Sequence, residues 1–323
     1  MTSSRFEQEN AHRWQRLEAM LVDVEKGRAP DDVQELPTVF RQTCHDLSIA
    51  QHRMYGTGVM GRLNELAIRG YRALERRTAG GWESLFRMLM VKFPKMVRAE
   101  WRLFWFCSLV FWGPFLFFAI WTPHDPEWAM SFLGPQQMVQ LESMYGEHTS
   151  PHDFLREKYG SDFMMFCFYI YNNVGIDLKT FAGGLLGGVG ALFVLLFNGL
   201  SIGASTGYIH HAGNPSTFYS FTAGHSAPEL IGIVISGMAG MRLGLALIMP
   251  GLRDRRTALV LGGKKAMTLI TGAATMTACA AVIEGFWSAW PMEPWIKYSF
   301  GAVVWCVTVS YLAFCGRRVA DEA

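Results

Sequence analysis

A histidine and a glutamate stand four residues apart in an apolar, glycine-rich part of the chain. His225 and Glu229 fall in the stretch 181–246, which also holds Asn198. Their spacing places both side chains on one face of a helix. Because ionisable groups in or beside membrane spans usually face a protein interior or a water-filled cavity, this pair marks the region where function is expected.

Four polar residues from neighbouring segments are expected at one depth in the membrane. The predicted span of Asn198 runs outward, the span of Glu229 runs inward, and the next span runs outward to Glu284. At about 1.5 Å per helical residue, Asn198 falls in the outer half of its span, and Glu229 and Glu284 fall near the outer ends of theirs. We therefore predict an outer polar cluster of Asn198, His225, Glu229 and Glu284.

This outer cluster is compatible with three kinds of chemistry. A histidine with carboxylates can bind a divalent metal, relay protons, or hold three spans together as a hydrogen-bonded lock. No HExxH signature is present, so the metal interpretation depends on His225 and Glu229 alone. Glu284 has no charged sequence neighbour and should be protonated or hydrogen-bonded, with His225 its expected partner and Glu229 a competitor. The sequence leaves the three alternatives open.

A second, inner cluster is expected deeper in the membrane. Arg242 lies about 20 Å below Glu229 along the same predicted span. That depth brings it near Asn172, Asn173 and Asp177 on another span. Since an unpaired guanidinium in lipid is costly, a partner among these three residues is predicted.

Composition and missing motifs narrow the function classes. Half of the 323 residues are hydrophobic and 17% are charged, below the quarter that is usual in soluble domains. A net charge of +2 gives no bulk attraction to nucleic acid. The sequence has no GxxxxGK[ST] loop, no dinucleotide fingerprint, no G-x-S-x-G elbow and no cysteine pair at metal-ligand spacing. These absences favour a non-enzymatic protein without a cofactor or a nucleic-acid partner.

Hydropathy predicts an all-α polytopic membrane protein. Lysine and arginine collect before the first span, in the loop 251–265 and in the tail, whereas 207–228 carries neither. This distribution predicts that both termini are cytoplasmic. Six apolar runs reach spanning length: 102–121, 162–178, 181–206, 229–250, 266–288 and 296–315.

The remaining segments give the domain organisation. Residues 1–80 contain three amphipathic helical patterns and are predicted to form a cytoplasmic helical bundle. Residues 81–101 alternate basic and apolar side chains, as in a helix lying at the membrane interface, with a bend at Pro94. Residues 102–323 form the transmembrane domain. Its extracytoplasmic loop, 123–161, is expected to contain one or two short amphipathic helices.

Glycine spacing suggests close helix packing. Gly183, Gly184, Gly187 and Gly188 make two overlapping GxxxG steps in the third predicted span. Such steps let a neighbouring helix approach closely, either within the chain or across a dimer. Together with apolar surface left over by six spans, they predict a homodimer in the lipid bilayer.

Several runs along the chain carry a family resemblance. They are Tyr171-Asn172-Asn173, Phe181-Ala182-Gly183-Gly184, Phe197-Asn198-Gly199, Gly224-His225-Ser226-Ala227-Pro228-Glu229 and Ala239-Gly240-Met241-Arg242. Together with Glu284 and the helical head, they resemble the stage II sporulation protein M family of integral membrane proteins, in its long, head-containing version. Phe40 and Ser226 depart from the residues that are more frequent in the family.

The resemblance implies a role as well as a fold. It implies a non-enzymatic scaffold or assembly platform in the bacterial inner membrane, linked to envelope and peptidoglycan remodelling or to an ATPase-associated stress system. The partners that it implies are MoxR-type ATPases and von Willebrand-type domain proteins on the cytoplasmic side. The alternative function is a channel or transporter that passes an ion, or a small or lipid-linked ligand, through the outer polar cluster.

Overall fold

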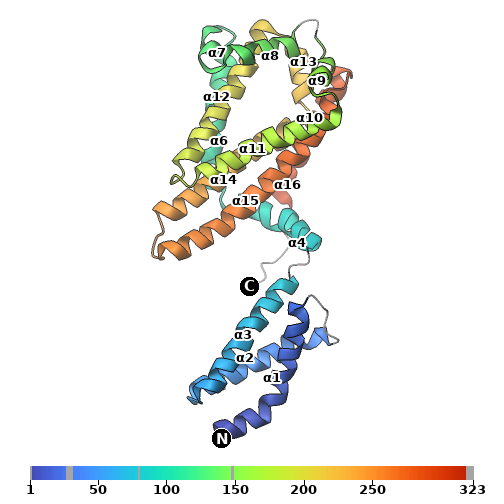
Figure 1. Ribbon diagram of the computed structural model, residues 1–323. Helices are drawn as coiled ribbons and strands as arrows, with labels where there is room; N and C mark the ends of the chain where they lie inside the picture. The colour runs from blue at the N-terminus through green and yellow to red at the C-terminus, as the bar shows by residue number, and fades with distance from the viewer. Residues whose placement is uncertain (1, 27–31, 79–80, 147–148, 318–323) are drawn as a thin grey trace. The chain divides into compact units, whose positions relative to one another are not determined.

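The chain is built from helices joined by short turns. The computed structural model describes residues 2–26, 32–78, 81–146 and 149–317, and these residues contain no strand (Figure 1). They divide into two compact units, Met1–Phe86 and Arg87–Ala323, which we call the head and the membrane unit. The all-α fold class predicted from the sequence is confirmed.

The head contains three main helices around one apolar core. They are α1 (Ser3–Glu25), α2 (Leu36–His52) and α3 (Thr57–Thr78), with a 3-10 turn, η1 (Val33–Glu35), before α2. Each helix turns an apolar stripe inward because its large side chains recur every three or four residues. The largest fully buried side chains are those of Trp14, Leu17, Leu21, Leu36, Leu63 and Leu66.

One acidic side chain is buried in the head and is fully paired. Asp46 accepts a hydrogen bond from the indole nitrogen of Trp14 at 2.9 Å and forms an ion pair with Arg13 at 2.9 Å. A buried carboxylate is costly unless it is paired in this way. Asp46 therefore fixes how α1 packs on α2.

The boundary between the two units falls at the end of α4 (Gly81–Arg87), whose last residue begins the membrane unit. The further elements of the membrane unit are η2 (Met88–Lys92), α5 (Phe93–Ala99), α6 (Trp101–Trp121), α7 (Glu127–Phe132), α8 (Pro135–Tyr145), α9 (Pro151–Tyr159), α10 (Asp162–Tyr169), η3 (Ile170–Val174), α11 (Gly175–Gly183), α12 (Val189–Ala212), α13 (Pro215–Thr222), α14 (Ser226–Ile248), α15 (Arg255–Ile283), η4 (Glu284–Ser288) and α16 (Pro294–Phe314). The predicted interfacial helix corresponds to α4–η2–α5. Its irregularity is a π-helical turn before Pro94, where the backbone adjusts to a residue without an N–H.

Among the described residues, five helices are long and apolar enough to cross a membrane: α6, α12, α14, α15 extended through η4, and α16. Of the best apolar window of α14, 72% is buried inside the protein, against 22% for α6 and for α16. Since α14 also contacts α6, α11, α12, α15 and α16, it is the central helix. The peripheral pair α6 and α16 presents apolar side chains outward.

The second predicted span, 162–178, is not among the five. It is helical from Asp162 to Gly183, with η3 in the middle, and α11 packs on α14, α12 and α15. Asn172, Asn173, Asp177 and Lys179 lower its hydropathy, and contacts with neighbouring helices cover Asn173 and Asp177 instead. The segment is therefore a helix packed among the spans, longer than its apolar run suggested.

The glycine run forms a turn and does not lie within a span. Residues 184–188 reverse the chain between α11 and α12, and Gly187 and Gly188 have φ values of +67° and +91°. Only glycine adopts such values readily. A Cβ on Gly184 would meet the backbone of Gly240, so the turn touches α14. The predicted close packing occurs here within the chain, and these glycines no longer support a homodimer, which stays a prediction.

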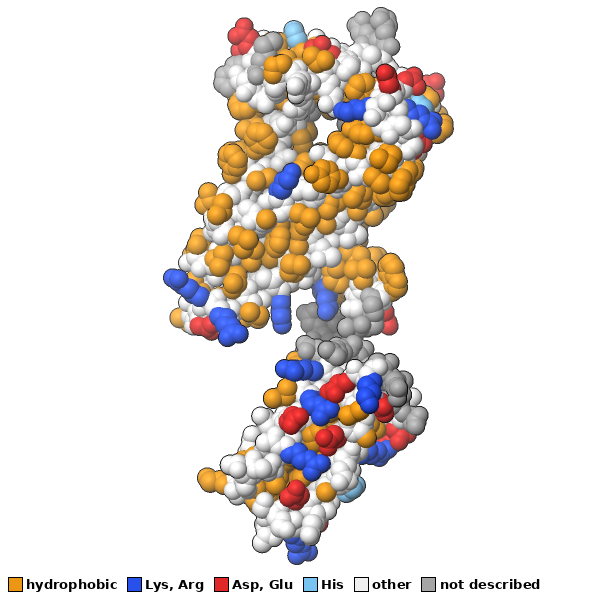
Figure 2. All heavy atoms as spheres, in the orientation of Figure 1, with side chains coloured by type: hydrophobic (Ala, Val, Ile, Leu, Met, Phe, Trp, Pro, Cys, Tyr) orange, Lys and Arg blue, Asp and Glu red, His pale blue; other side chains and the backbone are white. Residues whose placement is uncertain are grey.

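Short helices gather at one end of the membrane unit. Figure 1 shows α7, α8, α9 and α13 at the end opposite the turn between α14 and α15. Within the loop 123–161, the stretch 127–145 forms the two short helices α7 and α8, and α9 follows them. Figure 2 shows hydrophobic side chains over the middle of this unit, with lysine and arginine side chains near the α14–α15 turn and others at the opposite end. This banding is what a membrane-embedded unit requires.

Candidate functional site

The start of α14 positions two of the predicted residues. His225 is the N-cap of α14, and Glu229 lies one turn further along. Pro228 falls in the first turn, where the helix has no use for its missing N–H. The local sequence thus begins a helix at Ser226 and directs His225 and Glu229 to the same side.

Glu284 comes from the opposite helix at an irregular turn. It is the first residue of η4, the π-helical turn that follows α15. Such turns insert one extra residue into a helix and are frequent at functional sites. Because η4 also contains Ser288, both side chains lie close to His225.

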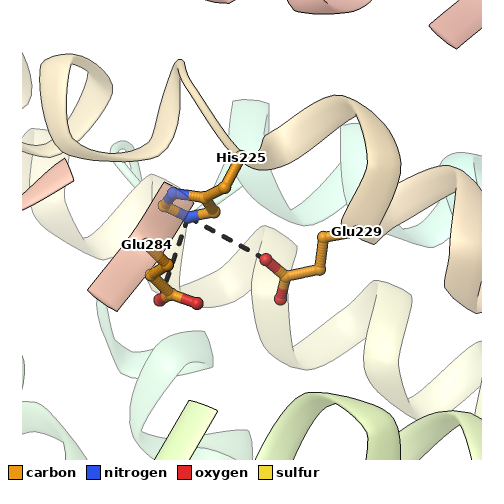
Figure 3. A group of neighbouring side chains, drawn as sticks. All are labelled: His225, Glu229 and Glu284. Atoms are coloured by element: carbon orange, nitrogen blue, oxygen red, sulfur yellow. Dashed lines mark ion pairs between the residues drawn. The ribbon is translucent and has the colours of Figure 1, made fainter. Parts of the chain in front are cut away.

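Three side chains converge here, and we call them the triad: His225, Glu229 and Glu284 (Figure 3). The Nε2 atom of His225 lies 3.9 Å from Oε2 of Glu229 and 3.9 Å from Oε1 of Glu284. The ligand-capable atoms of all three lie within 4.8 Å of one another. His225 is 5% exposed and Glu284 7% exposed, so the group is inside the protein.

Two further side chains hold the triad in place. The Nδ1 atom of His225 shares a hydrogen bond of 2.9 Å with Oγ of Ser288, which leaves Nε2 directed at the carboxylates. Asn173 donates from Nδ2 to Oε2 of Glu284 at 3.0 Å, and its own Oδ1 accepts from Asn172 at 2.8 Å. The orientations of His225 and Glu284 are therefore set from outside the triad.

A cavity of about 700 Å³ opens beside the triad. All three triad residues line it, together with aromatic side chains from α6, α13 and α16 and hydroxyl groups from α12. A second cavity, of about 660 Å³, lies next to it, and both are lined by Tyr145, Phe218, Phe221 and Glu284. This volume is in the range of small-molecule sites, which are typically apolar with a few polar groups.

Tyr145 belongs to α8, outside the membrane-spanning helices, and lines both cavities. Burial raises the pKa of its phenol well above the ordinary value, and the carboxyl groups of Glu284 and Glu229 add to that effect. Tyr145 is thus a neutral hydrogen-bond donor at the wall of both cavities.

Asn198 does not join the triad. Its Nδ2 donates to the carbonyl of Val194, one turn earlier in α12, at 2.7 Å. Among the described residues no hydrogen bond or ion pair links it to the other three predicted members. The prediction that Asn198 joins the outer cluster used its depth in the membrane alone. A side chain must also lie on the helix face that points to the cluster, and the amide of Asn198 instead bonds to its own helix.

The predicted inner cluster is not formed as expected. Asn172 and Asn173 belong with Glu284, because the helix that carries them continues to Gly183 and so places them higher than predicted. Asp177 accepts a hydrogen bond from Ser236 on α14 at 2.8 Å. It lies in a fully buried layer with Ser236 and Thr277 on α15. This second polar layer lies beneath the triad, on α11, α14 and α15.

Arg242 has a partner that the sequence did not indicate. Its Nε lies 3.3 Å from Oε1 of Glu100, which also accepts a hydrogen bond from Lys265 at 3.0 Å. Glu100 precedes α6 and lies in the predicted interfacial helix, 81–101. The predicted depths of residues within the spans therefore could not indicate it as a partner of Arg242. Ser288 and Ser236 were also missed, since an isolated serine in an apolar run carries no sequence signal.

The fold and the site together define a class of protein. It is a polytopic helical membrane protein with a buried histidine–carboxylate site beside an internal cavity. The sequence model for SpoIIM, stage II sporulation protein M, matches residues 108–289. The match covers more than half of the chain and includes the triad, and the chain belongs to this family.

A second family model matches the head. It is a domain of unknown function, DUF8413, and the match covers residues 4–76. No curated protein and no solved structure matches the chain.

Proposed function

We propose that the membrane unit is a carrier for a small or lipid-linked amphipathic ligand. The observation that supports this function is the 700 Å³ cavity with the triad in its wall. Its aromatic lining suits an apolar body, whereas the triad suits a polar end group. A buried, oriented polar group beside a cavity is the arrangement that a ligand-binding site provides.

The second polar layer favours transport over binding alone. Asp177, Ser236 and Thr277 are each buried, and they lie on the same helices as the triad residues, α14 and α15, and on α11. Thr277 and Ser236 both interact with the carboxyl group of Asp177, so the three side chains form one polar layer. Buried ionisable groups at successive depths are typical of ion and proton routes through carriers.

The proposed location is the bacterial inner membrane, with both termini cytoplasmic. The support comes from lysine and arginine near the α14–α15 turn (Figure 2). If the α10–α11 helix crosses together with the five long apolar helices, six crossings return the chain to its starting side. That count agrees with the distribution of basic residues.

Native ligand bound to the purified protein tests the carrier. The full-length protein is extracted in mild detergent, and its bound small molecules are identified by mass spectrometry. We expect an amphipathic molecule that is lost in Ser205→Phe, which fills the cavity, and kept in Ser131→Phe, on an exposed part of α7. Wild-type protein without such a molecule, or equal amounts in both variants, would refute the carrier.

A scaffold role is the second candidate, and it concerns the head. The head is a compact unit with its own core, and it matches a separate family model. A module of this kind suits docking of a soluble partner, such as a MoxR-type ATPase or a von Willebrand-type domain protein. Such docking would connect the membrane unit to envelope remodelling or to an ATPase-associated stress system.

Affinity capture from membrane-free extract tests the scaffold. Residues 1–86 serve as bait, and a matched bait carries Ile68→Ser and Tyr71→Ser, two exposed side chains one turn apart on α3. We expect an ATPase or von Willebrand-type protein on the first bait and less on the second. If only the membrane unit captures these partners, the proposed role of the head is wrong.

A further inference from the structure

The triad has the donor atoms of a metal site. An imidazole nitrogen and carboxylate oxygens are ligands for Zn²⁺ and other first-row divalent cations. Here one nitrogen and two carboxylates, from α14 and η4, face a common centre (Figure 3). The two polypeptide segments that carry them are packed firmly, since α14 and α15 share the most extensive contact in the membrane unit.

The separations fit a shared ion better than direct hydrogen bonds. Each distance from Nε2 of His225 to a carboxylate oxygen is 3.9 Å, whereas an N–H···O bond is about 2.7–3.2 Å. Ligand atoms about 2.1 Å from a tetrahedral zinc ion lie roughly 3.4 Å from one another. A small rotation of the carboxylates therefore suffices to bring them to a common ion.

The free nitrogen of the imidazole points to the same conclusion. His225 is 5% exposed, and its Nε2 forms no hydrogen bond among the described residues, although Nδ1 is bonded to Ser288. In metal sites, a hydrogen bond to one ring nitrogen of a histidine orients the other nitrogen toward the metal. Asn173 orients the carboxyl group of Glu284 in the same manner. Both features are present around many metal ligands.

A bound cation also satisfies charge balance. Two carboxyl groups in a buried site are neutralised either by protonation or by a cation, and no described lysine or arginine forms an ion pair with the triad. Lys297, which is buried nearby, donates to the carbonyl of Ser288 at 2.7 Å and lines a different cavity. A divalent cation bound to a neutral imidazole and two carboxylates gives a neutral site.

We propose that His225, Glu229 and Glu284 bind one divalent transition-metal cation, with one coordination position open to the 700 Å³ cavity. Three protein ligands and one open position are the arrangement of metal sites that bind a further molecule. The cation then selects a ligand whose polar end carries an oxygen donor, such as a phosphate or carboxylate. This inference rests on the proposed carrier for the role of that open position, but not for metal binding itself.

Metal binding by the tag-free, full-length protein in detergent tests the proposal. The protein is stripped with a chelator and titrated with Zn²⁺ and, separately, Mn²⁺, while bound metal and the melting temperature are measured. We expect one saturable equivalent per chain and a rise in melting temperature. Glu229→Gln and Glu284→Gln should each weaken binding at least tenfold, and Glu157→Gln, a surface change on α9, should leave it unchanged.

The supporting residues provide a second, gentler test. Ser288→Ala and Asn173→Ala retain all three ligands, and each should weaken metal binding about tenfold by releasing a ligand from its fixed orientation. X-ray absorption of the zinc-loaded protein should show nitrogen and oxygen ligands without sulfur. Absence of a saturable equivalent, or binding that is indifferent to Glu229→Gln and Glu284→Gln, overturns the proposal and leaves the triad as a structural lock.

The two proposals fail separately. If an amphipathic molecule still co-purifies and is lost in Ser205→Phe, but no metal binds at the triad, the metal site is wrong and the carrier stands. If one metal ion binds per chain but no amphipathic molecule is found, the metal site stands and the carrier is wrong.

Discussion

Asn173 donates a hydrogen bond to Oε2 of Glu284 at 3.0 Å, which joins the α10–α11 helix to the end of α15. The bond occupies one carboxylate oxygen and leaves the other, Oε1, facing His225 at 3.9 Å. The helix that is not among the five long apolar helices therefore orients the site. The polar residues that lower the hydropathy of this helix form hydrogen bonds with the triad and with the polar layer beneath it.

The first prediction concerns coupling within the triad. His225→Ala removes the group that lies between the two carboxylates, and Glu284→Gln removes one of them. Because both changes alter the same buried network, their effects on thermal stability in detergent should be non-additive, by about 1–3 kcal/mol. Combining His225→Ala with Glu100→Gln is the control, since Glu100 pairs with Arg242, about 20 Å further along α14. That pair should be additive, and additivity in both pairs would mean that no such network exists.

A second prediction uses the contact between the glycine turn and α14. A Cβ on Gly244 would collide with the backbone of Gly187 and Gly188, which cannot move without opening the turn. Gly244→Ala should therefore destabilise the membrane unit by about 2 kcal/mol or more. Gly263 on α15 has nothing within 4 Å of its Cβ position, so Gly263→Ala should be neutral or slightly stabilising. Melting temperatures in detergent compare the two, and equal losses would show that α14 does not pack on the turn as described.

The third prediction concerns Glu100. Glu100 pairs with both Arg242 and Lys265, and its own side chain is 19% exposed. Glu100→Gln leaves two cations facing a neutral amide and should lower stability by about 1 kcal/mol, since Lys265 is partly solvated. The loss should shrink in high salt, which screens the repulsion between the two cations. A loss that does not depend on salt would assign the effect to packing.

Much of the architecture was predictable from the periodicity of apolar residues and from the length of the apolar runs. The helices of the head follow from apolar residues such as Trp14, Leu17 and Leu21, which recur at three- and four-residue steps. Convergence of His225, Glu229 and Glu284 was also predictable, because two helices of known direction and a rise of 1.5 Å per residue fix depth. Neither result required knowledge of side-chain contacts.

The partners of the other polar residues depended on helix ends and faces. Asn173 was placed too deep because the end of α11 is set by Gly187 and Gly188, whose positive φ values cannot be read from hydropathy. Depth also says nothing about which face of α12 carries Asn198. Glu100 lies before the first predicted span, although it pairs with Arg242. Local patterns therefore located the site but not its supporting hydrogen bonds.

The last prediction uses Cys44, the single cysteine in residues 1–86, as a reporter of the folded head. Burial raises the pKa of this thiol above its ordinary value. Only the thiolate reacts with alkylating agents, so a raised pKa lowers the reactive fraction at neutral pH. The rate of alkylation of Cys44 in residues 1–86 should therefore rise with pH along a curve displaced to higher pH than that of the same thiol in urea.

The same shift has a defined effect on stability. The folded head favours the protonated thiol, so the contribution of Cys44 to stability is full below the pKa of the unfolded thiol. It is lost as the pH rises through the folded pKa. Cys44→Ala removes the titrating group and should remove that part of the pH dependence. Alkylation curves that coincide in buffer and in urea would show that α2 does not bury Cys44 and that residues 1–86 do not fold by themselves as described.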